Sequence, residues 1–226
     1  MRTKLFKLIK LLIGFMLCAV GIVLTINANL GLSPWDVLHE GISKTTGITM
    51  GNANILVSAI VLALNIFWGE NLGWGTILNM IIIGRLIDII MLNHLIPVAS
   101  NFVSGILMLV IGMIFLSLGC YLYIGVGLGS GARDGMMVAL QKRSGKPIKV
   151  VRGFLEIGAV IIGFLLGGTI GIGTIITSIG LGYCMQFIFK AFNFNVVGVE
   201  HRYIKEDMKT LISFFYKYAD KIKVCK

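Results

Sequence analysis

The chain has 226 residues, of which 57% are hydrophobic and only 13% are charged, whereas soluble domains usually carry about 25% charged residues. Two stretches, residues 102–131 and 157–189, contain no charged residue, and each exceeds the ~20 residues that cross the ~30 Å hydrocarbon core of a bilayer. The composition therefore excludes a soluble protein. The net charge of +10 does not indicate nucleic-acid binding, because the basic residues gather in both termini and one central loop, as in cytoplasmic segments of membrane proteins.

The hydropathy pattern predicts an all-α integral membrane protein with about six transmembrane helices. The first apolar run, residues 11–28, follows a basic N-terminus, but it is too long for the apolar part of a signal peptide, so we expect it to remain as a helix. Polar stretches at 29–50 and 128–149 separate the first helix of each half from the next. The predicted spans are about 8–28, 52–68, 75–92, 102–127, 150–166 and 172–190.

The two halves of the chain resemble each other at a fixed offset of 98 positions. Several glycines and one acid coincide under this offset: Gly14 with Gly112, Gly21 with Gly119, Gly84 with Gly182, and Asp36 with Asp134. The short segment 73–77 likewise falls on 171–175. The pattern predicts a first membrane repeat at 1–98, a second at 99–195 and a separate tail at 196–226. The alternative is a coincidence between two apolar sequences.

Because each repeat holds three spans, an odd number, the second repeat should be inverted relative to the first. The distribution of Lys and Arg agrees, since residues 1–10 hold four, 29–50 hold one, 128–149 hold five and the chain after 189 holds eight. Cytoplasmic segments are rich in these residues, so we expect both termini in the cytoplasm and the chain in the plasma membrane. The loop around Glu70 breaks the pattern. A fold with four spans per half and parallel repeats is the alternative.

Each polar stretch contains the start of a short helix. Ser33, Pro34 and Asp36 supply a cap, a proline for the first turn and an acid near the positive end of the helix dipole. The second copy replaces residues 33–35 with glycine, alanine and arginine but keeps the acid as Asp134. These helices are too short to span, so each is either re-entrant or lies on the membrane surface. Paired broken helices at matching positions are typical of transporter sites.

Charged residues also occur within apolar helices, where each costs at least ~2.5–3.5 kcal/mol at the bilayer centre. Arg85 and Asp88 are three positions apart, so they share a helix face and can pair. Arg152 and Glu156 are four positions apart near the start of a helix. The alternatives to a functional role are a structural ion pair and, for Arg152, a side chain that reaches out to the headgroups.

These patterns give a set of candidate residues for binding a substrate or ion. The candidates are Asp36, Asp134, Arg133, Arg85, Asp88 and Ser33, with Asn54, Arg152 and Glu156 as secondary candidates. The aspartates would take a proton or a cation, and the arginines, together with the helix N-termini, would hold an anionic group.

No pattern in the sequence favours an enzyme, and we expect no catalytic residue, cofactor or metal site. His39, His94 and His201 lie far apart in the chain, and neither an HExxH motif nor a nucleophile elbow occurs. The four cysteines form no CxxC pair and are interpreted as small apolar residues.

The tail after residue 199 differs from the rest of the chain. A stripe of apolar residues at helical spacing, with lysines around it, predicts a basic amphipathic helix on the cytoplasmic leaflet, bound to anionic lipids. The stripe comprises Ile204, Met208, Leu211, Phe215, Tyr218 and Ile222. A helix that binds a partner protein is the second interpretation.

The repeated Leu-Gly-x-x-x-x-Asp elements at 30–36 and 128–134, and the Gly-Leu-Ser-Pro-Trp-Asp segment at 31–36, resemble the YitT/YczE-type family of bacterial membrane proteins, in particular its YczE branch. The resemblance covers roughly residues 5–195. It implies a multi-span protein of the bacterial plasma membrane, and it supplies no substrate or catalytic residue. The second copy departs from the first at residues 131–133, so the halves should differ in function.

The function that these features favour is a small secondary transporter or permease with a small-molecule substrate. A membrane accessory or scaffold protein, which would support another enzyme or transporter, is the alternative, and a membrane-embedded enzyme is a distant third. The sequence does not name the substrate, the coupling ion or the transport direction, and it is compatible with a homo-oligomer.

Overall fold

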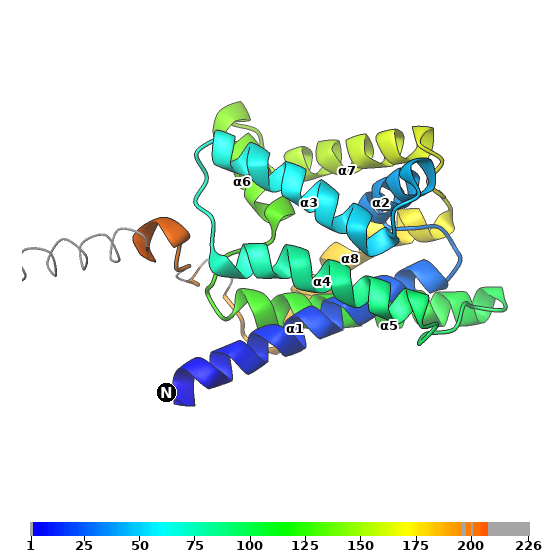
Figure 1. The fold of residues 1–226 in the computed structure, drawn as a ribbon, viewed down its shortest axis with the longest axis horizontal. Coiled ribbons are helices and arrows are strands. Elements are labelled where there is room, and N and C mark those ends of the chain that lie inside the picture. The colour runs from blue at the N-terminus through cyan, green and yellow to red at the C-terminus, as the bar shows by residue number, and fades with distance from the viewer. Residues whose placement is uncertain (1, 196–197, 200, 208–226) are drawn as a thin grey trace, which may run out of the picture.

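The computed structural model describes residues 2–195, 198–199 and 201–207 (Figure 1). Within that part the chain is helical and contains no strand, so the prediction of an all-α fold is confirmed. The helices are α1 (Arg2–Asn27), α2 (Pro34–Thr46), α3 (Met50–Phe67), α4 (Trp74–Leu92), α5 (Phe102–Ile124), α6 (Ala132–Ser144), α7 (Ile148–Leu165) and α8 (Ile172–Ala191).

Five of these helices, α1, α3, α4, α5 and α8, are long and apolar enough to cross a membrane within the described residues. The predicted sixth span, α7, has 18 residues but carries Lys149, Arg152 and Glu156. Its exposed side is nevertheless apolar, with Phe154 and Ile161 among the exposed side chains. A sixth span and the division of the chain at residues 98 and 195 stay predictions.

The helices α1 and α5 lie side by side and run antiparallel (Figure 1). Gly14 lies against Gly119 near one end of the pair, and Gly21 lies against Gly112 further along. A Cβ atom on Gly21 would lie only 2.8 Å from the carbonyl oxygen of Gly112. Small residues let helix backbones approach closely in membranes, so these glycines set the distance between the two helices.

Contacts between the two halves occur in matching pairs. If residue i of the first half contacts residue j of the second half, residues i + 98 and j − 98 make the same contact. The N–H of Gly75 donates to the carbonyl oxygen of Leu128 at 2.8 Å, and the N–H of Gly173 donates to that of Leu30 at 2.7 Å. The helix pairs α2 with α7 and α6 with α3 follow the same rule. Within the halves, the contact of α1 with α4 is repeated by that of α5 with α8. Each half therefore contacts the other through matching residues.

One helix contact of the first half has no comparable counterpart in the second half. The helix α3 packs on α4, but α7 makes at most a marginal contact with α8. Asp88 of α4 accepts hydrogen bonds from the N–H of Gly51 at 2.7 Å and the hydroxyl of Thr49 at 2.6 Å, which caps α3. The residues at the matching positions of the second half are Gln186, Lys149 and Pro147, which cannot repeat this cap.

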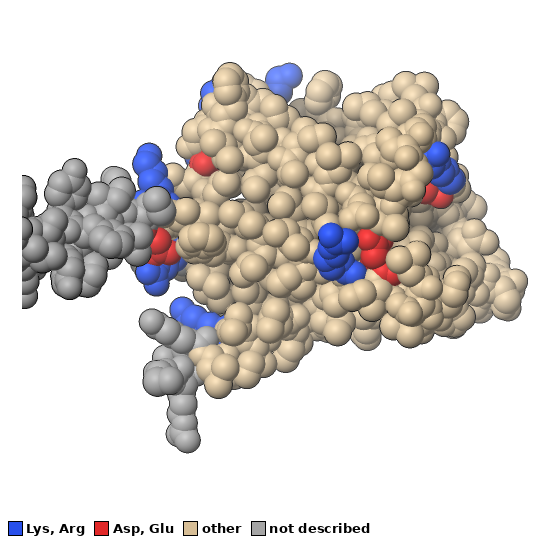
Figure 2. Space-filling view, viewed as in Figure 1, with Lys and Arg blue, Asp and Glu red and all other residues tan. Residues whose placement is uncertain are grey.

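The surface of the molecule fits a bilayer. Large apolar side chains are exposed along α1, α5, α7 and α8, among them Ile13, Val103, Phe154 and Tyr183. Figure 2 shows a wide face of uncharged residues with isolated charged patches, and several Lys and Arg side chains toward the end where α1 begins. This distribution supports a multi-pass membrane protein, because lipid-facing surfaces are apolar.

The start of the predicted tail helix docks on the membrane part. The N–H of Arg202 donates to the carbonyl oxygen of Gly127 at 2.8 Å, and the N–H of Ile204 donates to that of Leu72 at 2.8 Å. Residues 204–207 are helical. The rest of the predicted apolar stripe, from Met208 onward, lies outside the described residues.

Candidate functional site

The two short helices begin at the same cavity. The first residues of α2 and of α6 line a cavity of about 230 Å³ near the middle of the molecule. Its polar and aromatic lining comes from both halves of the chain: Ser33, Trp35, Asn54, Ser58, Asn79, Tyr123, Arg133, Asp134, Arg152, Glu156, Thr177 and Ser178. Two helix N-termini, with their partial positive charge, therefore face the same cavity, whose wall also contains many apolar side chains.

The turn before α2 is fixed by a close approach of two backbones. Gly31 has φ +103°, and a Cβ atom there would lie 2.3 Å from the backbone nitrogen of Gly171. Only glycine fits such a position. After it, Ser33 and Pro34 begin α2 as predicted, although the Ser33 side chain makes no capping bond to the backbone. Its hydroxyl donates instead to Asp36 Oδ2.

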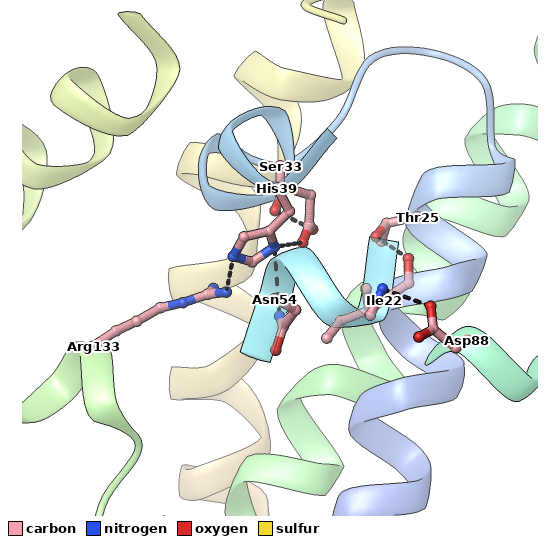
Figure 3. A network of polar contacts seen from close by, with 9 residues as sticks. Ile22, Thr25, Ser33, His39, Asn54, Asp88 and Arg133 are labelled. Atoms are coloured by element: carbon pink, nitrogen blue, oxygen red, sulfur yellow. Dashed lines mark hydrogen bonds and ion pairs between the residues drawn. The ribbon is translucent and has the colours of Figure 1, made fainter. Parts of the chain in front are cut away.

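A chain of polar contacts runs from α2 to α6 beside the cavity (Figure 3). His39 Nδ1 lies 3.2 Å from Asp36 Oδ1, and Arg133 Nη2 lies 3.4 Å from His39 Nε2. Asn54 of α3 approaches the same ring, with its Nδ2 atom 3.5 Å from His39 Nδ1. Asp36 is 3% exposed and His39 is 0% exposed, so the chain is enclosed by protein.

The contact with Arg133 selects one tautomer of the neutral His39 ring. A guanidinium has only N–H donors, so Nε2 of His39 must accept from Arg133. The proton of the neutral ring then lies on Nδ1 and is donated to Asp36. The network thus links a carboxylate of the first half to a guanidinium of the second half through one neutral imidazole.

The Arg133 side chain makes a second contact besides the one with His39. Its guanidinium lies over the ring of Trp35, 4.8 Å from the ring centroid. Such a cation–π contact stabilises a cation by about 0.5–2 kcal/mol, more where water is excluded. Trp35 and His39 both lie on α2, so this one helix holds Arg133 at two points.

Three further charged side chains line the cavity. Asp134 lies in the first turn of α6, beside Arg133. Arg152 Nε donates to Glu156 Oε1 at 2.8 Å, which is an ion pair within α7. The spacing of four positions thus brings Arg152 and Glu156 together on α7, and both line the cavity.

Arg85 and Asp88, which can share a helix face, have other partners in the structure. Asp88 turns toward the N-terminus of α3, where it accepts from Gly51 and Thr49, while Arg85 Nη1 lies 3.4 Å from Asn52 Oδ1. Figure 3 shows Asp88 apart from the His39 network. The free N–H groups of a helix start are strong donors, and they compete successfully with an arginine one turn away. Neither Arg85 nor Asp88 lines the cavity.

Most of the candidate residues predicted from the sequence thus lie at or beside the cavity. Two of them, Arg85 and Asp88, lie elsewhere. Ser33, Asp36 and Arg133 belong to one network, Asn54 adjoins it, and the remaining cavity candidates are Asp134, Arg152 and Glu156. Sequence reasoning missed His39 and Trp35. The spacing of Asp36 and His39, three positions apart on a helix, was a usable signal, because it places both on one face.

No group of three or more His, Cys, Asp or Glu side chains suited to a metal ion occurs among the described residues. Three cysteines, Cys18, Cys120 and Cys184, are described, and all are free thiols. Cys18 and Cys120 line the cavity.

Comparisons with known proteins place the chain among membrane proteins without an assigned activity. A family model described as a family of unknown function (DUF6198) matches residues 5–190. The chain belongs to this family. It is 32% identical to the uncharacterized membrane protein YczE of Bacillus subtilis over 178 residues, 77% of this chain and 81% of that protein.

Two further relatives have similar coverage. An uncharacterized protein of Haemophilus influenzae is 36% identical over 177 residues, 78% of this chain and 80% of that protein. The uncharacterized protein YyaS of Bacillus subtilis is 29% identical over 184 residues, 78% of this chain and 89% of that protein. No solved structure matches the chain. The resemblance to the YczE-type proteins is confirmed, and with it a multi-pass membrane location.

Proposed function

We propose that this protein is a small secondary transporter or permease of the plasma membrane, and not an enzyme. The observation that carries the proposal is the shared cavity, where the N-termini of α2 and α6 meet and Arg133 reaches across to His39. Discontinuous helices that meet at the interface of two repeats are the typical substrate site of secondary transporters. Enclosed charged groups in a membrane protein are costly and are usually functional.

The proposal includes two three-helix repeats of inverted topology, with α2 and α6 re-entrant. Antiparallel packing of α1 and α5, which are equivalent under the offset of 98, supports inversion, because parallel repeats would give these helices the same direction. The exchanged hydrogen bonds of Gly75 with Leu128 and of Gly173 with Leu30 support a two-fold relation. The burial of Asp36 and His39 supports re-entrant helices over helices that lie on the surface.

The proposed orientation has both termini in the cytoplasm. A series of contacts links the basic segments to one end of the molecule: Lys10 lies over the Tyr121 ring, and Lys142 pairs with Glu70 at 2.8 Å. Lys44, in contrast, pairs with Glu40 and contacts the turn at Gly167. The pairing with Lys142 also accounts for the acidic loop around Glu70, which would lie on the basic, cytoplasmic side.

The transport proposal is tested without knowledge of the substrate. Purified protein in liposomes is exposed to a bacterial extract of small metabolites, and the trapped compounds are identified by mass spectrometry. We expect at least one compound to accumulate in these liposomes and not in protein-free liposomes. If the two sets of liposomes trap the same compounds under every ion gradient applied, the protein is not a transporter.

The topology is tested separately with single cysteines at positions 40 and 142 in a variant that lacks the four native cysteines. A membrane-impermeant thiol reagent applied to intact cells should label position 40 and leave position 142 unlabelled. Labelling of both positions, or of position 142 alone, would overturn the inverted topology.

A second candidate function, a membrane accessory or scaffold protein, is favoured by the docked segment at 202–207. This segment joins the tail to the loops at Leu72 and Gly127. A partner bound to the tail would therefore be mechanically connected to the membrane part. Under this proposal, truncation after Asp207 abolishes cellular function while the membrane part stays folded. Full function of the truncated protein would exclude the scaffold role of the tail.

A further inference from the structure

We propose that the cavity binds a small monocarboxylate together with one proton, and that His39 is the proton site. This inference rests on the proposed transport function and names its substrate class and its coupling ion. It follows from the contacts of the His39 ring with Arg133 and Asp36.

Proton binding and the Arg133 contact exclude each other at one atom. Nε2 of His39 accepts from Arg133 at 3.4 Å, and it is also the nitrogen of the neutral ring that can take a second proton. A protonated Nε2 is a donor and carries positive charge, so it repels the guanidinium. Asp36, at 3.2 Å from Nδ1, remains an acceptor and stabilises the imidazolium.

The charged groups that face His39 are few. Asp36 lies on its own helix, and Arg133 approaches from α6. The helix α3 contributes the neutral amide of Asn54, and α7 crosses α2 nearby with Gly163, which carries no side chain. Protonation of His39 therefore acts chiefly on Arg133.

A released Arg133 stays at the cavity. Its guanidinium lies over Trp35, and both residues line the cavity wall together with the N-termini of α2 and α6. A guanidinium binds a carboxylate with two parallel hydrogen bonds, and helix N-termini favour an anion. The proton thus turns Arg133 from a partner of His39 into a partner of the substrate.

The charged side chains at the cavity favour a substrate that carries a single negative charge. Arg152 is already neutralised by Glu156 at 2.8 Å, and Asp134 lies beside Arg133. One proton on His39 adds one positive charge, which balances one carboxylate. A dianion such as sulfate would add one uncompensated negative charge next to Asp134 and Glu156, at a high cost in a space of low dielectric.

The test uses the full chain in lipid nanodiscs, with acetate, butyrate and benzoate as probes and sulfate, which is a dianion throughout the tested pH range, as the comparison. Binding is measured by the shift of the thermal unfolding temperature at about pH 5.5 and about pH 8, either side of the usual range for histidine. We expect at least one carboxylate to bind roughly tenfold more tightly at the lower pH, as expected for linked binding sites. An indicator dye should show uptake of about one proton per bound carboxylate.

Three variants make the test specific. His39→Gln keeps an amide near Arg133 but cannot be protonated, so its carboxylate affinity should not change with pH. Arg133→Gln should lose binding at both pH values, and His94→Gln, at an exposed histidine, should behave like the wild type. The proton uptake is measured on the wild-type protein. The proposal can therefore still be tested if the His39→Gln variant does not fold.

The outcomes separate this inference from the transport proposal. Absence of carboxylate binding, equal affinity at both pH values, or tighter binding of sulfate would overturn the inference, even if liposomes accumulate another compound. Proton-linked carboxylate binding without accumulation in liposomes would instead support the site and refute transport.

Discussion

The carboxylate of Asp88 accepts a hydrogen bond of 2.7 Å from the backbone N–H of Gly51, which joins α4 to the first turn of α3. Gly51 is essential to this contact, because a Cβ atom there would lie 2.0 Å from the carbonyl oxygen of Gly84. The contact fixes α3 against α4, and α3 in turn carries Asn54 to the His39 network.

We predict that Asp88→Asn destabilises the protein. The amide retains one acceptor, but the negative charge that favours the start of α3 is lost, and so is at least one good hydrogen bond, for about 1–3 kcal/mol. Thermal unfolding in detergent measures the loss. Arg85→Gln is the matched control on the same helix, since its contact with Asn52 is exposed, and it should change stability by less than about 0.5 kcal/mol. Equal effects of the two substitutions would contradict the assigned role of Asp88.

Gly21→Ala should disturb the packing of α1 on α5. The added Cβ atom would lie 2.8 Å from both the carbonyl oxygen of Gly112 and the N atom of Leu116, and overpacking of this kind costs about 1–3 kcal/mol. Gly158→Ala in α7 meets nothing within 4 Å and should leave the unfolding temperature nearly unchanged. A tolerated Gly21→Ala would indicate that the two helices can separate without loss.

Arg133→Lys should reduce substrate accumulation in liposomes by at least about tenfold at equal protein levels, because an ammonium lacks the planar fork of donors that reaches His39 and stacks on Trp35. Arg143→Lys is a matched control. Arg143 also lies over a tryptophan ring, that of Trp68, at 5.8 Å, but Arg143 does not line the cavity. If both variants transport like the wild type, Arg133 does not contact the substrate.

The double substitution Asp36→Asn and Asp134→Asn should abolish cellular function while the protein level stays normal. An asparagine at position 36 would offer His39 no charge to stabilise an imidazolium, and an asparagine at position 134 would remove the carboxylate beside Arg133 at the cavity. A complementation assay in a strain that lacks the gene, with immunoblotting for protein level, provides the measurement. Intact function in this double variant would remove both aspartates from the proposed site.

The helices could be predicted from the sequence because hydropathy and turn residues are local properties. The uncharged runs indicated α5 and α8, and Ser33 with Pro34 indicated the start of α2. The same local properties left the partner of Asp88 open, between Arg85 and groups elsewhere in the fold. Spacing along one helix does not reveal that the unpaired N–H groups of another helix, at Gly51, lie nearer to the carboxylate.

The site was only partly predictable, because its central contact joins residues that are 94 positions apart, His39 and Arg133. The sequence placed Arg133 and Asp36 in matching stretches of the two halves, but it did not show that the stretches meet. His39 was set aside since no second histidine lay near it, whereas its actual partners are a carboxylate on its own helix and a guanidinium from the other half.

The paired hydrogen bonds from Gly75 to Leu128 and from Gly173 to Leu30 make the halves dependent on each other for folding. Residues 1–98 expressed alone would bring the N–H of Gly75 and the carbonyl of Leu30 into the bilayer without their partners, at several kcal/mol each. We therefore expect a lone half to be degraded, and co-expression of the two fragments should protect both.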